Sequence, residues 1–454
     1  MSFPKYPAYK ESGVDWLGEI PERWRIKPLW TLFRRHKLTG FPDEQLLSVY
    51  RDYGVIPKAS RDDNFNKPSD DLGAYQLVQV GDLAINKMKA WQGSVGISSY
   101  RGIVSPAYHV YAPSHLECPQ YLHHLFRCNE YITGYLANSK GIRVNQWDLE
   151  PQQHSRMPVL LPSFQEQTQI ARFLDHETAR IDALIEEQQR LIELLKEKRQ
   201  AVISHAVTKG LDPTVPMKDS GVEWLGEVPA HWALRPLKYQ CRFSGGGTPS
   251  KDNLEYWNGD IPWVSPKDMK RFWLSDTEDK ITELAIQESS ANLVKPGALL
   301  MVVRSGILQR TIPVAINTVP VTLNQDMKAL IFDGERTAEF VAFFISGFER
   351  LILQAWRKQG ATVESIEHEY VANTMIPIPP KEELVGIVNA MRAVEVKFDS
   401  LSSESACLIR KLQERRSALI SAAVTGKIDV RNWQPPAGQY PAGDTQNRTE
   451  PEVV

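Results

Sequence analysis

Two stretches of this chain are nearly the same: Ser12-Gly-Val-Asp-Trp16-Leu-Gly18-Glu-Ile-Pro21-Glu-Arg-Trp24 and, 208 residues later, Ser220-Gly-Val-Glu-Trp224-Leu-Gly226-Glu-Val-Pro229-Ala-His-Trp232. A second pair lies 217 residues apart: Ala201-Val-Ile-Ser-His-Ala-Val-Thr208 and Ala418-Leu-Ile-Ser-Ala-Ala-Val-Thr425. The segments between these motifs, residues 30–149 and 239–367, share almost no such likeness. A constant frame is therefore duplicated around two different inserts. Because a repeated segment must meet the same requirement twice, the inserts are free to recognise different things.

The size and composition are those of a large globular protein. The 454 residues exceed one ordinary domain, and the longest apolar run, residues 298–303, is too short to span a membrane. The first residues have no signal-peptide pattern. The cysteines show neither a disulfide framework nor CxxC spacing, which favours a reducing compartment. They are Cys118, Cys128, Cys241 and Cys407. We expect a cytoplasmic protein.

The charge balance argues against tight nucleic-acid binding by this chain alone. Fifty-three basic and fifty-five acidic residues give a formal net charge of −2. A self-sufficient DNA-binding protein usually carries a basic excess or stripe. A protein that reads bases while partner subunits neutralise much of the phosphate charge would escape this objection.

Each copy of the frame ends in a long helix with a heptad pattern. The apolar positions alternate in steps near three and four residues, as in a coiled coil. In residues 165–206 they are Ile170, Leu174, Ile181, Leu184, Leu191, Leu195 and Val202, interrupted by Gln188 and Lys198. In residues 382–424 they are Ile387, Met391, Val394, Phe398, Leu401, Leu408, Leu412 and Leu419, interrupted by Ser405 and Arg415.

The recurrence of the polar interruptions predicts that the two helices pack on each other, because a polar seam residue fixes register. An antiparallel pair is the simplest geometry. A helix of some forty residues is on the order of 60 Å long, so the pair could hold two inserts apart in approximate two-fold symmetry, as two half-sites on one DNA duplex require. On the heptads alone, an ordinary coiled-coil scaffold is the better interpretation.

The inserts are expected to be mixed and rich in strands. Alternation and β-branched or aromatic residues indicate strands near residues 46–50, 75–80, 82–86 and 107–111 of the first insert. In the second insert the strand candidates are residues 261–264, 298–303, 312–316 and 327–332. Helices are expected to close the inserts, around residues 119–138 and 337–359.

These features together resemble the DNA-specificity subunit of type I restriction-modification systems. The resemblance covers nearly the whole chain and is carried by the duplicated Gly-Val-x-Trp-Leu-Gly-x-x-Pro-x-x-Trp signature, the proline-rich entry to a long helix, and Ile-Ser-x-Ala-Val-Thr at its end. The second insert adds Ser244-Gly-Gly-Gly-Thr248-Pro-Ser250 and Leu323-Asn324-Gln325-Asp326, similar to segments of that family's target recognition domains. The first insert lacks the Gly-Gly-Thr-Pro segment and resembles another subtype, so its base preference should differ.

The resemblance implies an α+β fold with two mixed α/β target recognition domains, joined by two long antiparallel coiled-coil helices in an internal pseudo-two-fold repeat. The expected divisions are residues 1–157 (frame segment and first recognition domain), 158–212 (central helix), 213–376 (repeated frame segment and second recognition domain), 377–432 (C-terminal helix) and 433–454 (a disordered tail, because the segment lacks apolar content).

The resemblance also implies a non-catalytic subunit that reads an asymmetric bipartite site in double-stranded DNA. It would bind two methyltransferase (modification) subunits and motor-endonuclease (restriction) subunits in defence against foreign DNA. S-adenosylmethionine, ATP and Mg would serve those partners, and this chain would hold no cofactor.

A catalytic role for the chain itself finds little support. Phe243-Ser-Gly-Gly-Gly247 matches the F-x-G-x-G of adenine methyltransferases, but no Asn-Pro-Pro-aromatic or Asp-Pro-Pro-aromatic tetrapeptide exists. Asp268, Glu278 and Lys280 loosely imitate a nuclease constellation, which a solvated charged loop explains equally well. No phosphate-binding loop of the G-x-x-x-x-G-K-[ST] type is present. His123, His124 and Cys128 do not complete a four-ligand metal set.

The candidate DNA-contacting residues are cations and amides near expected strand ends, because arginine suits guanine and asparagine or glutamine suits adenine. They are Arg51, Lys58, Lys87, Lys89, Arg101 and Arg143 in the first insert, and Arg304, Gln309, Arg310, Asn324, Gln325, Lys328 and Arg357 in the second. Any one of them could instead be a solvated surface residue.

The frame and partner candidates are four repeated tryptophans and six leucines. The tryptophans are expected to pack where a recognition domain meets the helices, since a large aromatic side chain supplies much packing area. The set is Trp16, Trp24, Trp224, Trp232, Leu184, Leu191, Leu195, Leu401, Leu408 and Leu412. Two other classes stay open: a scaffold that bridges proteins without binding DNA, and a self-contained DNA methyltransferase or nuclease.

Overall fold

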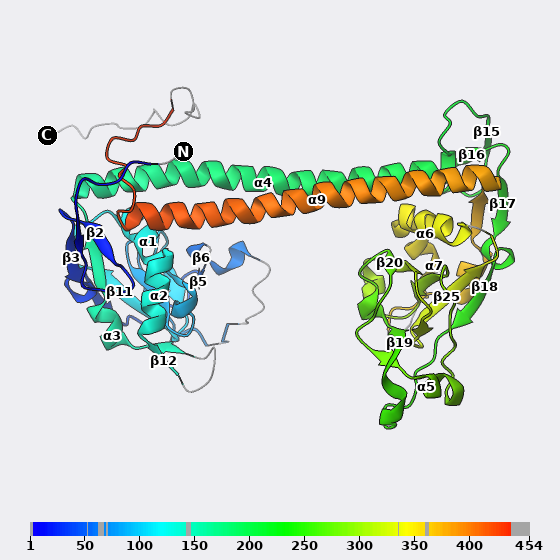
Figure 1. Cartoon of the computed structure of the whole chain (residues 1–454). Coiled ribbons are helices and arrows are strands. Elements are labelled where there is room, and N and C mark those ends of the chain that lie inside the picture. The colour runs from blue at the N-terminus through cyan, green and yellow to red at the C-terminus, as the bar shows by residue number, and fades with distance from the viewer. Residues whose placement is uncertain are drawn as a thin grey trace. The chain divides into compact units, whose positions relative to one another are not determined.

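The structure is a computed structural model that describes residues 3–51, 53–61, 68–69, 71–141, 147–334, 336–358 and 363–436. The chain forms two compact units: unit 1 is Met1–Gln188 with Cys407–Val454, and unit 2 is Gln189–Ala406. Two long helices, α4 (Phe164–Lys209) and α9 (Lys381–Val424), each give one part to each unit (Figure 1). The α+β fold with paired long helices, predicted from the sequence, is confirmed.

Both units contain the same small frame of two antiparallel strand pairs. In unit 1, β1 (Tyr9–Glu11) pairs with β2 (Glu19–Pro21), and β3 (Arg25–Pro28) pairs with β14 (Pro158–Leu161). In unit 2, β15 (Met217–Asp219) pairs with β16 (Glu227–Pro229), and β17 (Ala233–Pro236) pairs with β26 (Met375–Ile378). The expected starts of the two long helices, at residues 158 and 377, are both corrected, because strands β14 and β26 occupy these positions and the helices begin at Phe164 and Lys381. Residues 158–161 are a strand because proline and the residue before it favour extended backbone.

The first insert is an antiparallel structure covered by short helices. Its main sheet has the order β4 (Phe33–His36), β11 (Tyr108–Pro113), β8 (Leu83–Asn86), β9 (Val95–Ile97). Three strand pairs surround it: β5 (Leu47–Tyr50) with β6 (Gly54–Pro57), β7 (Gln76–Val78) with β10 (Gly102–Val104), and β12 (Ser139–Lys140) with β13 (Asp148–Leu149). The helices are α1 (Pro119–Arg127), α2 (Asn129–Ala137) and α3 (Pro151–Arg156).

The second insert has a different topology that includes parallel pairs. Its five-stranded sheet has the order β18 (Cys241–Gly245), β25 (Met327–Phe332), β22 (Leu299–Val302), β23 (Val314–Asn317), β20 (Trp273–Leu274). A second sheet has the order β21 (Lys280–Ile281), β19 (Trp257–Val264), β24 (Thr322–Leu323). The pairs β20–β23 and β19–β24 are parallel. The helices are α5 (Glu283–Glu288), α6 (Thr337–Gly347), α7 (Glu349–Trp356) and α8 (His368–Asn373).

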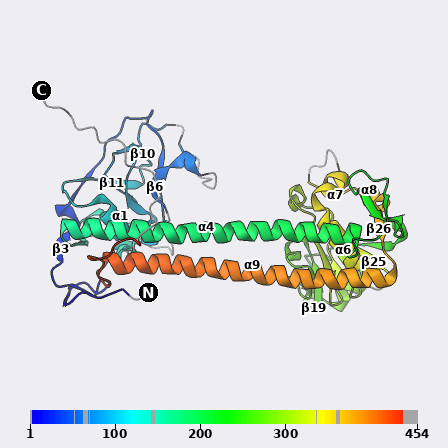
Figure 2. The same cartoon turned by 90° about the horizontal axis from the view of Figure 1, so that it is seen from above.

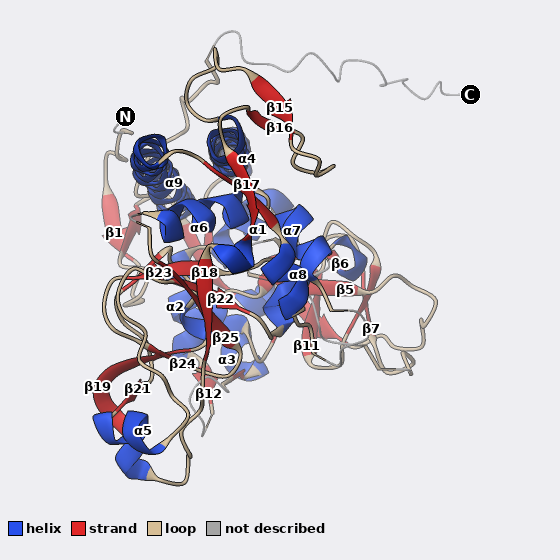
Figure 3. Ribbon diagram, turned by 90° about the vertical axis from the view of Figure 1, so that its right-hand side faces the viewer, coloured by secondary structure: helices blue, strands red, loops and turns tan. Residues whose placement is uncertain are grey.

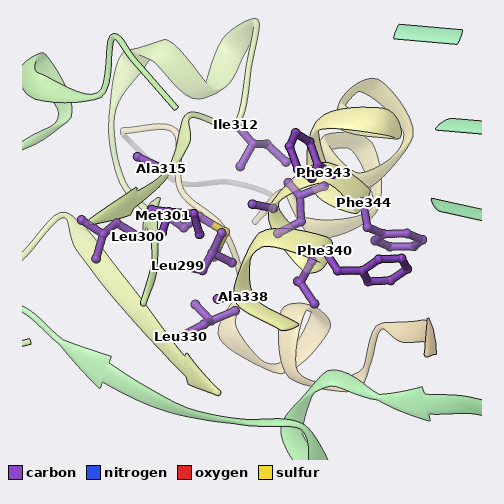
Figure 4. Packing of buried hydrophobic residues seen from close by; sticks show 14 of the residues in the cluster. Leu299, Leu300, Met301, Ile312, Ala315, Leu330, Ala338, Phe340, Phe343 and Phe344 are labelled. Carbon is purple, nitrogen blue, oxygen red and sulfur yellow. The ribbon is translucent and has the colours of Figure 1, made fainter. Parts of the chain in front are cut away.

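The core of unit 2 lies between its five-stranded sheet and α6. Leu299, Leu300 and Met301 of β22 belong to the same buried cluster as Phe340 and Phe344 of the helix (Figure 4), whose rings pack against Trp232 and Trp224 of the frame. Figure 3 shows α6 lying against the sheet formed by β18, β22 and β25. The hydrophobic face of the sheet is thus covered by one apolar helix, which fixes where the loops at the sheet ends emerge.

The two long helices pack antiparallel along each other (Figure 2). In unit 1, Arg416 of α9 donates from Nε to Oδ1 of Asp182 on α4 at 2.8 Å. In unit 2, Arg199 of α4 donates from Nη1 to Oδ1 of Asp399 on α9 at 2.9 Å. From Asp182 to Arg199 the residue number rises along α4, whereas that of the contacted α9 residue falls from 416 to 399, so the helices run antiparallel. Both pairs are related by the 217-residue repeat, so the duplicated sequence forms one ion pair twice.

The predicted seam of the helix pair needs correction at several positions. Buried or half-buried side chains recur at Ile181, Ile185, Gln188, Ile192, Leu195 and Arg199 of α4, and at Phe398, Ser402, Ser405, Ile409, Leu412 and Arg416 of α9. Leu184, Leu191, Leu401 and Leu408 are exposed instead. The second polar interruption of each seam, predicted at Lys198 and Arg415, is wrong because both side chains are exposed. The half-buried polar positions are instead Arg199 and Arg416, the arginines of the ion pairs. Two adjacent apolar stripes run along each helix, and periodicity alone does not tell which one is inside.

Each long helix ends at a glycine with left-handed backbone. Gly210 and Gly426 both have φ of +75°. A Cβ at Gly426 would lie 2.4 Å from Pro21 Cδ, and one at Gly210 would lie 2.9 Å from Glu383 Oε1. These glycines therefore serve as helix C-caps and also allow the close approach of the frame.

Candidate nucleic-acid interface

The repeated signature attaches each frame to the first turn of a long helix. The buried indole of Trp24 donates from Nε1 to Oε1 of Glu166 at 3.0 Å, and Trp232 donates to Oε1 of Glu383 at 3.0 Å. A carboxylate in the first helical turn also interacts favourably with the helix dipole. The same buried hydrogen bond thus occurs twice, at equivalent places of the repeat.

The other two repeated tryptophans lie between frame and insert. Trp16 packs edge-on against Tyr131 of α2, with ring centroids 5.2 Å apart. Trp224 packs against Phe344 and Phe348 at the end of α6. The contacts fit the predicted packing role, and they fix each insert to its frame through the helix that closes the insert.

In unit 2 the glycine-rich segment packs against the loop of residues 323–326. A Cβ at Gly246 would lie 1.9 Å from the carbonyl oxygen of Asn324, and Gly247 N–H donates to the carbonyl of Leu323 at 2.8 Å. The glycines are therefore required for backbone approach. Thr248 Oγ1 then lies 3.3 Å from Oε1 of Gln325, whose side chain is exposed.

Arg304 stands beside this loop with one carboxylate partner. Its Nε donates to Oδ1 of Asp326 at 2.6 Å, and 51% of its side chain is exposed. Within the described residues its guanidinium has no other hydrogen-bond partner. The Arg304 and Val303 N–H groups both donate to the carbonyl of Asp326, at 3.3 and 2.8 Å. The backbone of Arg304 and its carboxylate partner are thus held together.

A third segment, residues 364–366, pairs with the backbone beside Arg304. Ser305 N–H donates to the carbonyl of Glu364 at 3.0 Å, and isolated bridges link Arg304 to Ser365 and Arg357 to Ile366. Arg357 donates from Nε to Oε2 of Glu364 at 2.8 Å. The edge of the second insert therefore gathers exposed cations from segments about fifty residues apart in sequence.

The remaining candidates of the second insert occupy less prominent places. Asn324 is buried, and its side-chain carbonyl accepts from Asp326 N–H at 3.0 Å, so its amide is used within the loop. Lys328 lies on β25, and burial lowers the pKa of its ammonium group. Gln309 and Arg310 are exposed at the end of a 3-10 turn, Gly306–Gln309. The DNA-contact role of each residue stays a prediction.

The candidates of the first insert are dispersed. Arg101 donates from Nε to Oε1 of Glu44 at 2.8 Å, in the arrangement seen at Arg304. Lys87 is paired with Asp148 at 2.8 Å, and the carbonyl of Arg51 accepts from Arg127 Nη2 at 2.7 Å. Lys58 follows β6 in a short 3-10 turn, and Lys89 precedes another. Arg143 lies outside the described residues.

An aromatic-cation cluster at the β5–β6 hairpin was not found by sequence reasoning. The guanidinium of Arg61 lies 4.6 Å from the ring centroid of Tyr53 and 5.3 Å from that of Tyr50. The Tyr53 side chain is largely exposed. Nothing in a strand pattern marks Arg61, which directly follows a short 3-10 turn, Lys58–Ser60, after the hairpin. The two nearby tyrosines were the available signal.

Buried histidines distinguish the electrostatics of unit 1. Burial, with a smaller contribution from Arg127, lowers the pKa of His123 to about 3. Burial lowers the pKa of His154 to about 3, and burial together with Arg35 lowers the pKa of His109 to about 4. His154 Nδ1 and His109 Nε2 have no hydrogen-bond partner within the described residues. These rings are neutral parts of the core near neutral pH.

The side chains that could have formed a nuclease site make local hydrogen bonds and ion pairs instead. Both carboxylate oxygens of Asp268 accept hydrogen bonds, from Ser265 and from Glu278 N–H. Lys280 pairs with Asp276 at 3.1 Å. Among the described residues, no cluster of three or more His, Cys, Asp or Glu side chains could hold a metal ion. In the same part of the chain, no helix is both long and apolar enough to cross a membrane.

Four exposed leucines of the helix pair are related by the repeat and divide equally between the units, whereas the exposed Leu194 of α4, in unit 2, has Lys411 at the equivalent position. Leu184 of α4 and Leu408 of α9 lie in unit 1, and Leu191 of α4 and Leu401 of α9 lie in unit 2. The 217-residue repeat relates Leu184 to Leu401 and Leu191 to Leu408. Each unit thus presents one equivalent leucine from each helix, with the exposed fractions between 38% and 46%.

Comparison with known proteins gives consistent similarities. Residues 229–405 match the family model of the type I restriction modification DNA specificity domain. The type I restriction enzyme EcoR124I/EcoR124II specificity subunit of Escherichia coli is 34% identical over 273 residues. That alignment covers 58% of this chain and 60% of the relative, so it spans less than two thirds of the relative's length.

Two solved structures share the fold. One comes from work on the structural basis of complex assembly and conformational transition of the type I R-M system. Its TM-score is 0.63 at 18% sequence identity, and the alignment covers 89% of this chain and 98% of that chain. The other, the HsdS subunit from Thermoanaerobacter tengcongensis, has a TM-score of 0.50 at 17% identity and covers 90% and 98%.

Proposed function

Because this chain belongs to the specificity subunits of type I restriction-modification systems, we propose that it is the non-catalytic subunit that selects the DNA sequence for such a complex in the cytoplasm. Each insert would read one half of an asymmetric bipartite site in double-stranded DNA. One observation carries this proposal: the same buried Trp–Glu hydrogen bond supports two inserts of different topology. A repeated support with different contents suits two different half-sites.

The long helices would set the gap between the half-sites and hold partner subunits. A 46-residue helix such as α4 is about 69 Å long at 1.5 Å per residue. The exposed leucines that the 217-residue repeat relates suit two copies of one partner, since one partner can bind the same surface residues twice. We propose that these partners are two methyltransferase subunits, with motor-endonuclease subunits joining the complex.

The partners would also supply charge and chemistry. The chain has a net charge of −2, and several exposed arginines of the inserts are paired with carboxylates. Phosphate neutralisation would therefore come largely from the partners, while this chain contributes contacts to base edges. S-adenosylmethionine, ATP and Mg would be bound by the methyltransferase and motor-endonuclease subunits.

The test is to co-express the chain with its methyltransferase subunit in a methylation-free host and map modified adenines by long-read sequencing. We expect an asymmetric motif of two half-sites that disappears when this chain is omitted. As a matched control, exchanging the first insert alone for that of another specificity subunit should change one half-site and leave the other. An intact purified complex that produces no motif would contradict the proposal and favour the protein-bridging scaffold. Methylation by the purified chain alone would favour a self-contained enzyme.

A further inference from the structure

We propose that Arg304, oriented by Asp326, reads a guanine in the half-site bound by unit 2. This inference rests on the proposed function and deepens it, since it assigns one base type to one side chain. Its starting point is the one hydrogen bond that the Arg304 side chain makes with the described residues, from Nε to Oδ1 of Asp326 at 2.6 Å.

The geometry of the Arg304–Asp326 pair leaves the Nη1 and Nη2 groups of the arginine available to a base. A guanidinium has five N–H donors in a planar fork, and a carboxylate on Nε uses only one of them. The Nη1 and Nη2 groups of Arg304 have no partner within the described residues, and half of the side chain is exposed. Two parallel N–H groups match the O6 and N7 acceptors of guanine in the major groove. Adenine presents a donor at the position of O6, so the same fork rejects it.

The support beneath Arg304 is rigid. Asp326 N–H donates to Oδ1 of the buried Asn324 at 3.0 Å, and Asn324 N–H donates to the carbonyl of Val264 at 2.9 Å. Gly246 packs directly against this loop, at a distance that excludes any Cβ. Backbone contacts hold the main chain of Asp326, and Nδ2 of Asn324 donates to its Oδ2 at 3.5 Å. Because the carboxylate is placed in this way, the arginine loses little further freedom when it binds a base, which favours affinity and specificity.

Charge favours base reading over phosphate binding at this position. A phosphate contact gains from an uncompensated cation and the release of counterions. Arg304 shares its charge with Asp326, so the pair as a whole attracts phosphate weakly. The Nη1 and Nη2 groups can still donate to a base edge, because such hydrogen bonds depend on where the donors lie and not on the net charge of the pair. Exposed cations that have no carboxylate partner among the described residues, such as Arg310, lack this orientation.

The experiment uses the purified complex of the full chain with its methyltransferase subunits. Random-sequence DNA duplexes are bound to the wild-type complex and to Arg304→Ala, Arg304→Lys and Asp326→Asn complexes, and the bound DNA is sequenced. The affinity for a non-specific duplex is measured as a function of salt concentration. The control variant is Lys238→Ala, which removes an exposed cation of the frame that binds Asn373 Oδ1 at 2.8 Å.

We expect Arg304→Ala to lower the preference for guanine at one position of one half-site by on the order of 10-fold to 100-fold, and to leave the other half-site and the salt dependence unchanged. Arg304→Lys should keep part of the preference, because lysine lacks the planar fork. Asp326→Asn should weaken the same guanine preference several-fold and increase the non-specific affinity at low salt. Lys238→Ala should leave the recognised sequence unchanged.

Three results would overturn the inference. One is a uniform loss of affinity for all sequences in Arg304→Ala with a salt slope reduced by about 1, the behaviour of a phosphate contact. Another is an unaltered motif in Arg304→Ala, and a third is an unaltered guanine preference in Asp326→Asn. If the wild-type complex itself selected no sequence, the proposed function would fail first, and this inference with it. The two failures are therefore distinguished by the wild-type sample.

Discussion

Unit 1 and unit 2 agree in their frames and differ in their inserts. The paired strands, the Trp–Glu hydrogen bond, the glycine C-cap and the Arg–Asp pair all occur twice at equivalent positions. The inserts share none of this. One has an entirely antiparallel main sheet, and the other mixes parallel and antiparallel pairs. The parts that attach to the long helices are therefore constant, whereas the parts proposed to contact DNA differ between the units.

The cores of the two units differ in chemistry as well. Unit 1 buries the rings of Tyr121, Tyr131 and Tyr135 together with the neutral His154. Unit 2 buries Phe340, Phe343 and Phe344 in the corresponding layer beneath the helices. A buried neutral histidine makes the stability of its core depend on pH, whereas phenylalanine rings do not titrate. Two equivalent frames can thus support units whose stabilities respond differently to pH.

The largest expected effect is a greater loss of stability at acid pH in unit 1, which holds three strongly shifted histidines, than in unit 2, where burial lowers the pKa of His368. Folded-state pKa values of about 3, 3 and 4 for His123, His154 and His109 lie below the unfolded value of 6.5. The unfolded chain therefore binds protons more tightly. This stability is complete above about pH 6.5 and is lost as the pH falls towards 4, by about 2 kcal/mol for each histidine at pH 5.

Urea unfolding at pH 7.5 and pH 5, with limited proteolysis to identify the unit that opens, measures this effect. His154→Gln should reduce the pH dependence, and His205→Gln, at an exposed position of α4 in unit 2, should not. Earlier opening of unit 2 at pH 5 would contradict the assignment.

The next effect tests the equivalence of the frames. Trp24→Ala and Trp232→Ala should each lower the free energy of unfolding by about 3–5 kcal/mol, because each empties a buried site and leaves a carboxylate without its indole donor. Thermal unfolding and gel filtration with the methyltransferase subunit would show loss of folding or assembly for both. Trp30→Ala, at a side chain that is 60% exposed, is the control. Normal assembly with an altered recognition sequence would refute the packing role.

A smaller effect tests whether the inserts share a reading device despite their different folds. Arg101 is oriented by Glu44 through Nε, as Arg304 is by Asp326. Arg101→Ala should change base preference in the half-site opposite to the one altered by Arg304→Ala, by about 1–3 kcal/mol. Sequencing of the DNA selected by the two variant complexes gives the comparison. If both variants altered the same half-site, the assignment of one insert to each half-site would be wrong.

The smallest effect concerns the one place where the repeated ion pairs differ. Arg199 binds the buried Glu395 as well as Asp399, whereas Thr178 occupies the equivalent position in unit 1. Burial raises the pKa of Glu395, and Arg199 opposes that rise. Arg199→Ala should therefore cost about 1–3 kcal/mol, and Arg416→Ala less than about 1 kcal/mol, since Asp182 is exposed.

Denaturant unfolding of both variants would measure this difference. Adding Glu395→Thr to Arg199→Ala should restore most of the loss, because it reproduces the residue found in unit 1. Equal losses for Arg199→Ala and Arg416→Ala would show that the buried carboxylate does not depend on its arginine.

The sequence predicted the parts of the molecule that repeat or alternate. The duplicated frame, the long helices and strands such as β5 and β25 follow from local patterns that a single segment contains. The seam of the helices was predicted one residue away from its position at Leu184 and Leu191, because Ile185 and Ile192 form an equally apolar stripe beside it. Amphipathicity gives a face, and only the partner helix selects the buried edge.

The candidate site was less accessible to prediction because its contacts join distant segments. Arg304 could be chosen for its residue type and its place at a strand end. Its orientation depends on Asp326 and on the segment containing Ser365, which forms an isolated bridge with it, and no local spacing reveals either. The buried state of Asn324 likewise follows from its packing against Gly246, which only the fold brings together.

The way unit 1 is closed has a consequence for the order in which the chain is completed during synthesis. Asp429 N–H donates to the carbonyl of Pro4 at 2.8 Å, Tyr9 Oη donates to the carbonyl of Gly426 at 3.1 Å, and Lys427 pairs with Glu130. Unit 2, in contrast, is one continuous stretch of chain. A ribosome that has reached residue 406 has made all of unit 2 but has not yet made the segment that seals unit 1. Since domains fold as units when their residues become available, the half that is synthesised first is the half that is finished last.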